Sequence, residues 1–236
     1  MESLIQDTVE TRVQSVLAKI RAATEKAGRP AGSVRLVAAT KTVAIPQIAE
    51  GVRAGLSILG ENRVQEALTK IPAFNHSQVQ WHFIGQLQRR KVRSVVGVFN
   101  LIHSVDSLEL AQEIDRRAGD AGHKQDVLLE VNIGNEPTKA GLRPDDVPDI
   151  VSVMARLPHV SIKGLMAIPP PTGDPESARP YFRKLKGLAK LIDAQHLPSV
   201  KMEELSMGMS NDYEVAIEEG ATLVRVGSAI FGARHV

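Results

Sequence analysis

Strand-like and helix-like segments alternate along almost the whole chain, and this alternation restricts the fold more than any other feature of the sequence. Eight short apolar segments are predicted strands: 34–40, 56–62, 79–85, 100–105, 126–134, 162–170, 202–208 and 222–227. Segments with helical spacing of apolar residues lie between them, including 45–55, 107–122, 144–158, 175–195 and 210–221. The repeat of about 25 residues matches one strand–helix unit of a parallel sheet.

Eight such units in 236 residues predict an α/β fold of the (β/α)8 type, the TIM barrel. An open, doubly wound sheet is the main alternative, but no Gly-x-Gly-x-x-Gly follows the first predicted strand. No linker or low-complexity segment divides the chain, so residues 1–236 are expected to form a single domain. Apolar residues at helical spacing, up to about Lys26, predict an extra N-terminal helix; they are Leu4, Val9, Val13, Val16, Leu17 and Ile20.

Composition excludes several classes of site and partner. The chain has no cysteine, which excludes disulfides, cysteine–zinc sites and a thiol nucleophile, and no metal site is predicted. The net charge of +2 does not require nucleic acid or an anionic membrane as a partner. The basic segment 88–93 has no interleaved aromatic residue, so a solvated helix face is expected there. Without a secretory signal or an apolar run near the roughly 20 residues of a membrane span, a soluble cytoplasmic protein is expected.

Polar or otherwise unusual residues stand near the carboxyl end of each predicted strand, where barrels of this type gather their chemistry. They are Lys41, Glu61, Asn62, His82, Ser104, Asp106, Asn132, Met166, Ser206, Met207, Ser210, Arg225, Gly227 and Ser228. A single polar strand end means little, because such ends are commonly exposed. Their repetition in register predicts one site at this face of the barrel.

Lys41 follows the small and apolar residues 36–40 at the end of the first predicted strand. Such a lysine is most often a solvated strand end. If it is held inside a site instead, desolvation favours the neutral amine, which is nucleophilic. Two other residues have equally simple structural explanations: His82 as a hydrogen-bonded core histidine, and Glu61 as a cap of the following helix.

The last predicted strand is followed by Gly227 and Ser228, and Ser210 opens a helix after the seventh strand. Glycine allows close backbone approach, and the start of a helix offers free N–H groups to an anion. Loops after strands seven and eight commonly bind phosphate in such barrels. The structural alternative is that Ser210 is an N-cap and Gly227 a turn residue. A lysine amine beside a phosphate site indicates Schiff-base chemistry, with either a phosphorylated sugar or pyridoxal 5′-phosphate (PLP) as the ligand.

The chain also carries a series of specific segments in a fixed order. These are VAATKTV (37–43), GENRVQEA (60–67), WHFIGQLQRRK (81–91), HSVDS (103–107), GLMAIPP (164–170) and the block 205–232. With them, the chain resembles the PLP homeostasis proteins, a family of single-domain proteins related in fold to the N-terminal barrel of alanine racemase. The resemblance covers residues 36–232, and Gln86 stands where the family usually has another residue.

The resemblance implies a role for each matching residue. Lys41 corresponds to the lysine that forms a Schiff base with PLP, and Arg225 to the arginine that faces the pyridine nitrogen. Phosphate binding is implied for Ser210, Gly227 and Ser228. Asn62 matches a residue near the ring substituents, and the remaining pocket-lining positions are His82, Met166, Ser206 and Met207.

The implied function is PLP binding for intracellular vitamin B6 homeostasis, in which the protein holds, buffers or supplies the cofactor without robust catalysis. Because arginine stays protonated, Arg225 disfavours the pyridinium form of PLP and weakens it as an electron sink. The alternative is a PLP-dependent amino-acid racemase, which needs acids or bases on both faces of its substrate. Related racemases take a tyrosine from an additional C-terminal domain, whereas this chain ends at Val236 and has only Tyr181 and Tyr213.

A class I aldolase is the third hypothesis, but it leaves Arg225 without a role. The expected partners are PLP and apo forms of PLP-dependent enzymes, with no nucleic acid or membrane. No long apolar helix face is left without a place in the barrel, so a monomer is expected. No motif marks a second, regulatory PLP site, although Lys139 and other lysines offer amines.

Overall fold

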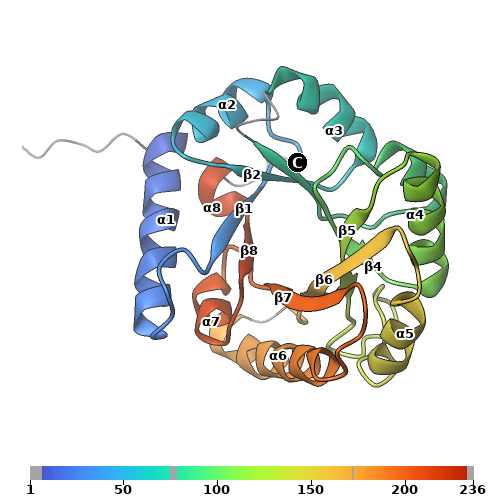
Figure 1. Cartoon of the computed structure of the whole chain (residues 1–236). Coiled ribbons are helices and arrows are strands. Elements are labelled where there is room, and N and C mark those ends of the chain that lie inside the picture. The colour runs from blue at the N-terminus through green and yellow to red at the C-terminus, as the bar shows by residue number, and fades with distance from the viewer. Residues whose placement is uncertain (1–6, 75–78, 172, 233–236) are drawn as a thin grey trace, which may run out of the picture.

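The computed structural model describes residues 7–74, 79–171 and 173–232, and within them eight parallel strands close into a barrel (Figure 1). Each strand pairs with its neighbours in chain order, and the last strand pairs with the first. The strands are β1 Arg35–Ala39, β2 Ile58–Glu61, β3 Gln80–Phe83, β4 Leu101–Val105, β5 Gln125–Glu130, β6 Val160–Met166, β7 Val200–Ser206 and β8 Leu223–Val226. The predicted (β/α)8 barrel is therefore confirmed.

Helices surround the barrel, as Figure 1 shows. The α-helices are α1 Val9–Lys26, α2 Ile45–Arg53, α3 Val64–Lys70, α4 Leu108–Asp120, α5 Val147–Met154, α6 Arg179–Asp193, α7 Tyr213–Glu218 and α8 Ser228–Phe231. The 3₁₀ helices are η1 Ile71–Ala73, η2 Arg89–Ser94 and η3 Pro175–Ala178. The basic segment predicted as a solvated helix face forms η2, which buries Val92 and exposes its arginines. No helix among the described residues is long and apolar enough to cross a membrane.

Two predicted strands extend four residues past the carboxyl ends of the observed ones. The segment 126–134 was expected to be extended throughout, but β5 ends at Glu130 because the Asn132 side chain organises the following loop, donating to the carbonyl oxygens of Glu136 and Lys139. Similarly, β6 ends at Met166, ahead of prolines that lack the N–H group a sheet requires. Both differences shorten the strands at the face where the polar residues gather.

Side chains alternate between the barrel interior and the helical layer, as expected for strands. One buried cluster fills the interior: Val37, Ile58, Leu101, Leu128, Met166 and Leu223. The residues next to them on the strands, such as Leu36, Leu59 and Ile102, join the larger core shared with the helices. The direction of side chains repeats every second residue along a strand. Arg225 therefore faces the barrel interior, as Leu223 does. Lys41, four residues after the inward-facing Val37, continues the same pattern just beyond β1.

The extra N-terminal helix is confirmed as α1, although Leu4 of the predicted pattern lies outside the described residues. Thr8 begins the helix with a capping box, in which its hydroxyl accepts from the backbone N–H of Thr11 at 3.2 Å. The buried face of α1, which includes Val13 and Val16, packs against α2, α7 and α8. Helix α1 therefore supports the short α8, which follows the predicted phosphate loop.

Candidate functional site

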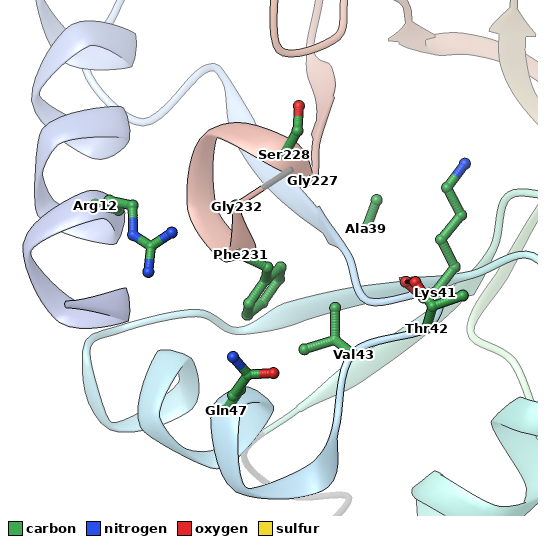
Figure 2. Close-up of a pocket in the computed structure, with 10 residues that line it drawn as sticks. All are labelled: Arg12, Ala39, Lys41, Thr42, Val43, Gln47, Gly227, Ser228, Phe231 and Gly232. Atoms are coloured by element: carbon green, nitrogen blue, oxygen red, sulfur yellow. Dashed lines mark hydrogen bonds between the residues drawn. The ribbon is translucent and has the colours of Figure 1, made fainter. Parts of the chain in front are cut away.

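A pocket of about 540 Å³ opens at the carboxyl end of β1, between α1, α2 and α8 (Figure 2). Its lining residues are Arg12, Ala39, Lys41, Thr42, Val43, Gln47, Gly227, Ser228, Phe231 and Gly232. The pocket brings together the ends of β1 and β8, which are neighbours only because the barrel closes. Three of the predicted site residues line it directly, namely Lys41, Gly227 and Ser228.

Lys41 is half-buried, two residues beyond the end of β1. Its extended side chain points away from α2 in Figure 2. The preceding residue, Thr40, is fully buried and lies on the helical side of the strand, where its hydroxyl donates to Glu61 at 2.6 Å. Lys41 is therefore not a fully solvated strand end.

The loop between β8 and α8 brings Ser210 close to the first N–H groups of that helix. The Ser210 hydroxyl lies 3.4 Å from the backbone nitrogen of Gly227 and 3.5 Å from that of Ala229. These contacts are long for hydrogen bonds, so the N–H groups are only weakly satisfied within the protein. A Cβ atom on Gly227 would lie 3.3 Å from Ala39, which shows how closely this loop approaches β1.

Arg225 lies inside the barrel and is 5% exposed. It donates through Nη1 to the Ser206 hydroxyl at 2.5 Å and through Nη2 to the carbonyl oxygen of Ala167 at 3.0 Å. Burial lowers the pKa of Arg225 to about 10, while the charges of Glu130 and Asp212 act to raise it. The guanidinium therefore stays charged at neutral pH, in an orientation fixed by β7 and the residue after β6.

A chain of hydrogen bonds continues from Arg225 across the barrel. The Ser206 hydroxyl lies 2.9 Å from Nδ1 of His103, and Nε2 of His103 lies 3.0 Å from Nδ1 of His82. Burial lowers the pKa of His82 to about 3 and also lowers the pKa of His103, so both imidazoles are neutral. These contacts match the hydrogen-bonded core histidine that was the simple alternative for His82. They also link it through Ser206 to Arg225.

The other predicted site residues differ in their surroundings. The Oδ1 atom of Asn62 is buried and has no hydrogen-bond partner within the described part of the chain, as expected for a group that awaits a ligand. Met166 belongs to the interior cluster of the barrel. Met207 is buried in the larger core shared with the helices and does not line the pocket. Of these three side chains, that of Asn62 best fits a role beside a bound polar molecule.

The acidic residue Glu130 lies near Arg225 at the same face of the barrel. Glu130 ends β5 on the inward-facing side, two residues after the interior Leu128. Burial, together with the charge of Asp106, raises the pKa of Glu130 to about 7, although the charge of Arg225 acts to lower it. This carboxyl group therefore keeps its proton to a higher pH than an exposed glutamate does.

Sequence reasoning missed several residues of this region. His103 lies inside an apolar segment at an inward position, and that alternation could have identified it. Arg12, Gln47 and Phe231 line the pocket because α1, α2 and α8 pack beside β1, an arrangement that no local pattern in the sequence encodes.

The Glu61 side chain is not a helix cap, because it is fully buried and accepts a hydrogen bond from the Lys70 ammonium at 2.8 Å.

Comparison with known proteins agrees with the barrel fold. The chain matches the family model described as alanine racemase, N-terminal domain, over residues 12–235. The pyridoxal phosphate homeostasis protein of Aquifex aeolicus (strain VF5) is 47% identical over 223 residues, which are 94% of this chain and 97% of the relative. The protein of the same name from Pseudomonas aeruginosa is 39% identical over 227 residues, 96% of either chain.

Two solved structures are informative. PipY of Synechococcus elongatus PCC7942, with PLP bound, is 35% identical, covers 95% of this chain and 100% of PipY, and superposes with a TM-score of 0.83. Alanine racemase of Clostridium difficile 630 has a TM-score of 0.72 at 16% identity, covering 96% of this chain and 58% of the racemase. The second similarity is one of fold alone.

Proposed function

The chain belongs to the family of pyridoxal phosphate homeostasis proteins, and on that basis we propose that it binds PLP reversibly and buffers or supplies it within the cell. The observation that carries this proposal is the pocket that joins Lys41 to Gly227 and Ser228. It places an amine and the start of α8 in one cavity, and the buried Arg225 comes two residues before Gly227 in the chain. PLP offers a matching set of groups: an aldehyde, a phosphate and a pyridine nitrogen.

Lys41 is the residue proposed to hold PLP covalently. When bound, PLP supplies an aldehyde that condenses with an amine: the neutral amine attacks the aldehyde carbon, a carbon–nitrogen double bond forms, and the aldehyde oxygen leaves as water. The Lys41 side chain is half-buried and lines the pocket, where its amine can meet a bound aldehyde. Reversal by water or by another amine releases the ligand, as a carrier requires.

The phosphate site is proposed to comprise Gly227, Ser228 and Ser210. The weakly satisfied N–H groups at the start of α8 can turn to an anion, and the hydroxyls of Ser210 and Ser228 add donors. The close approach of Gly227 to Ala39 fits a loop in which the backbone itself contacts the ligand.

Arg225 is proposed to face the pyridine nitrogen. Its guanidinium can donate but cannot accept a proton, and it is held in place by Ser206 and Ala167. Such a partner keeps the ring nitrogen unprotonated, and this weakens the ring as an electron sink. The same residue that binds the ligand therefore restrains chemistry on it, which supports a carrier over a fast enzyme.

Neither of the two tyrosines, both among the described residues, is suited to act as the second base of a racemase. Tyr213 begins α7, and burial raises its pKa to about 12, which disfavours proton transfer at neutral pH. Tyr181 lies within α6, in the helical layer outside the barrel. The remaining predicted pocket residues, Asn62, His82, Met166, Ser206 and Met207, are proposed to surround the ligand or to support the residues that do.

The covalent role of Lys41 is tested by trapping. Purified protein incubated with PLP is expected to show a visible absorption band, and borohydride reduction is expected to attach PLP permanently at Lys41, located by peptide mass spectrometry. The Lys41→Ala variant is expected to lose both the band and the adduct. Lys139→Ala is the matched control, because Lys139 is a half-buried lysine in a loop that does not line the pocket. An unchanged adduct in Lys41→Ala would show that the anchor is another lysine.

We also propose a monomeric, single-domain protein of the cytoplasm that delivers PLP to apo forms of PLP-dependent enzymes. A chain without cysteine fits a reducing compartment. Delivery predicts that PLP reaches an added apo-enzyme faster than it is released spontaneously into buffer.

A further inference from the structure

A buried ion cluster lies behind the segment that carries Lys41. It consists of Lys70, the last residue of α3, with Glu61 at the end of β2 and Glu66 on α3; we call it the Lys70 cluster. The Lys70 residue is 5% exposed and the Glu61 residue 0%. The Lys70 ammonium donates to Glu61 Oε1 at 2.8 Å, to Glu66 Oε1 at 2.6 Å and to the carbonyl oxygen of Thr40 at 2.7 Å. These acceptors use the full donor capacity of an ammonium group.

The cluster contacts both chain neighbours of Lys41. Before it, Thr40 is held through its carbonyl oxygen by Lys70 and through its hydroxyl, which donates to Glu61 at 2.6 Å. After it, the backbone N–H of Thr42 donates to Glu66 Oε1 at 2.5 Å. One cation and its two carboxylates therefore fix the backbone on either side of the proposed anchor.

The backbone at this point needs such support. Thr42 has a φ of +63°, in the left-handed region that a β-branched residue rarely adopts. Its hydroxyl donates to the carbonyl oxygen of Lys41 at 2.6 Å. A strained conformation of this kind persists only where its surroundings determine it strongly, and the bond from Thr42 to Glu66 is one such restraint.

Strand alternation separates the cluster from the pocket. Thr40 and Glu61 face the helical layer, whereas Lys41 faces the barrel mouth and lines the pocket. None of the cluster residues lines that pocket. The cluster therefore reaches the pocket through the backbone of Thr40 and Thr42, the two chain neighbours of Lys41, and Thr42 itself lines the pocket.

We propose that the Lys70 cluster is a positioning device for Lys41: it fixes Thr40 and Thr42 from behind the barrel wall so that the Lys41 amine projects into the pocket. This proposal rests on the covalent role of Lys41 proposed above. A buried ion pair is by itself weak grounds for a stabilising role, because desolvation offsets the attraction between its charges. Positioning explains why the charges are placed around the neighbours of one particular lysine.

The test separates covalent from noncovalent binding. The rate of covalent attachment is followed from the visible band and from borohydride trapping after mixing with PLP. Noncovalent affinity is measured by calorimetry with pyridoxine 5′-phosphate, which has the phosphate and ring but no aldehyde. We expect Lys70→Met to slow attachment by about 10- to 100-fold, because small misplacements of a reacting group have effects of that size. The affinity for pyridoxine 5′-phosphate is expected to stay within about two-fold of wild type.

Two variants at Glu66 keep the test decisive if Lys70→Met does not fold. Glu66 is only half-buried, so Glu66→Ala removes the acceptor for Thr42 at lower risk to the core. We expect Glu66→Ala to slow attachment, and Glu66→Gln, which keeps a carbonyl oxygen in reach of that N–H, to restore much of the rate. Glu113→Ala is the matched control, because Glu113 is also a helical glutamate with ion pairs, on α4; its attachment rate is expected to match wild type.

Attachment at the wild-type rate in folded Lys70→Met and Glu66→Ala would overturn the positioning role and leave the proposed function intact. An equal loss of affinity for pyridoxine 5′-phosphate would also overturn it, since the cluster would then support the pocket in general. If wild type itself forms no trappable adduct, the proposed function fails, and with it the role of the cluster.

Discussion

The buried carboxyl group of Glu130 makes the folding stability of the protein depend on pH. Burial and the charge of Asp106 raise its pKa from 4.5 to about 7, so the folded protein keeps a proton there that the unfolded chain has already released. Between these two values, unfolding releases the proton, and stability falls as the pH rises. Above about pH 7 the folded protein carries the full free-energy cost of an ionised Glu130, and below about pH 4.5 this cost is absent.

The Glu130→Gln variant should therefore be more stable than wild type at pH 8 and similar to it near pH 4.5. The expected gain at pH 8 is about 2 to 3 kcal/mol in the free energy of unfolding, since each unit of pKa difference corresponds to about 1.4 kcal/mol. Urea unfolding of the ligand-free protein at both pH values measures it. Asp126→Asn, at the opposite end of β5, is the control. A gain that is equal at both pH values would refute this explanation.

At the residue scale, the sequence was most informative where alternation along a strand could be combined with a motif. Lys41, Gly227 and Ser228 were predicted and line one pocket. The Lys70 cluster could not be predicted, because Lys70 lies 30 residues from its partner Thr40 and ends an ordinary amphipathic helix. Side chains that act through another residue leave no pattern of their own in the sequence.

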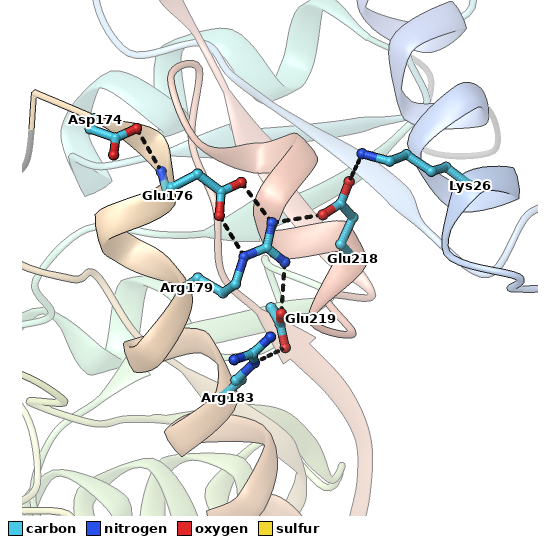
Figure 3. Close-up of polar contacts among 7 residues, drawn as sticks. All are labelled: Lys26, Asp174, Glu176, Arg179, Arg183, Glu218 and Glu219. Atoms are coloured by element: carbon cyan, nitrogen blue, oxygen red, sulfur yellow. Dashed lines mark hydrogen bonds and ion pairs between the residues drawn. The ribbon is translucent and has the colours of Figure 1, made fainter.

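At the scale of elements, a cluster of charges joins the helices α1, α6 and α7 and the 3₁₀ helix η3 at one side of the barrel (Figure 3). Arg179 of α6 donates to Glu176 of η3, to Glu218 at the end of α7 and to Glu219 just after it, at 2.7 to 2.8 Å. Glu218 also accepts from Lys26, the last residue of α1, at 2.6 Å. Arg179 is thus shared by three carboxylates, and α7 is tied to the helices on either side of it.

Replacing Arg179 with Met should lower the melting temperature by roughly 2 to 6 °C at low salt, because three carboxylates would lose their common partner and repel each other. The loss should shrink in 1 M salt, which screens such charges within a few ångströms. Arg183→Met is the matched control: it lies on the same helix and contacts Glu219 alone among these carboxylates, at 3.0 Å. Equal effects of the two variants would contradict the shared role of Arg179. A loss independent of salt would indicate packing instead.

Element boundaries were predicted less well than element order. The strand order and most helices followed from apolar spacing, but α8 was not separated from the strand before it, since it spans only Ser228–Phe231. A helix this short has too few residues to show a period. Its place is set by packing against α1, which is a tertiary contact between opposite ends of the chain.

At the scale of the whole molecule, the barrel is shared with alanine racemase, so fold alone does not distinguish a carrier from an enzyme. The distinction proposed here depends on Arg225 and on the absence of a suitable tyrosine among the described residues near the pocket. We expect incubation with L- or D-alanine, and with other amino acids, to give no racemisation at ordinary enzyme rates of about 1–1000 per second. Chiral chromatography measures it, with an authentic alanine racemase as the positive control. Turnover in that range would favour the racemase hypothesis.

The closed barrel also affects how prone the protein is to associate at high concentration in a cell. An enzyme acts many times per molecule, but a carrier acts once per bound ligand, so its capacity rises only with its own concentration. Crowded β proteins are prone to associate through unpaired strand edges. In this barrel β8 pairs with β1, so none of the eight described strands offers such an edge. The topology that builds the pocket is therefore also one that tolerates accumulation.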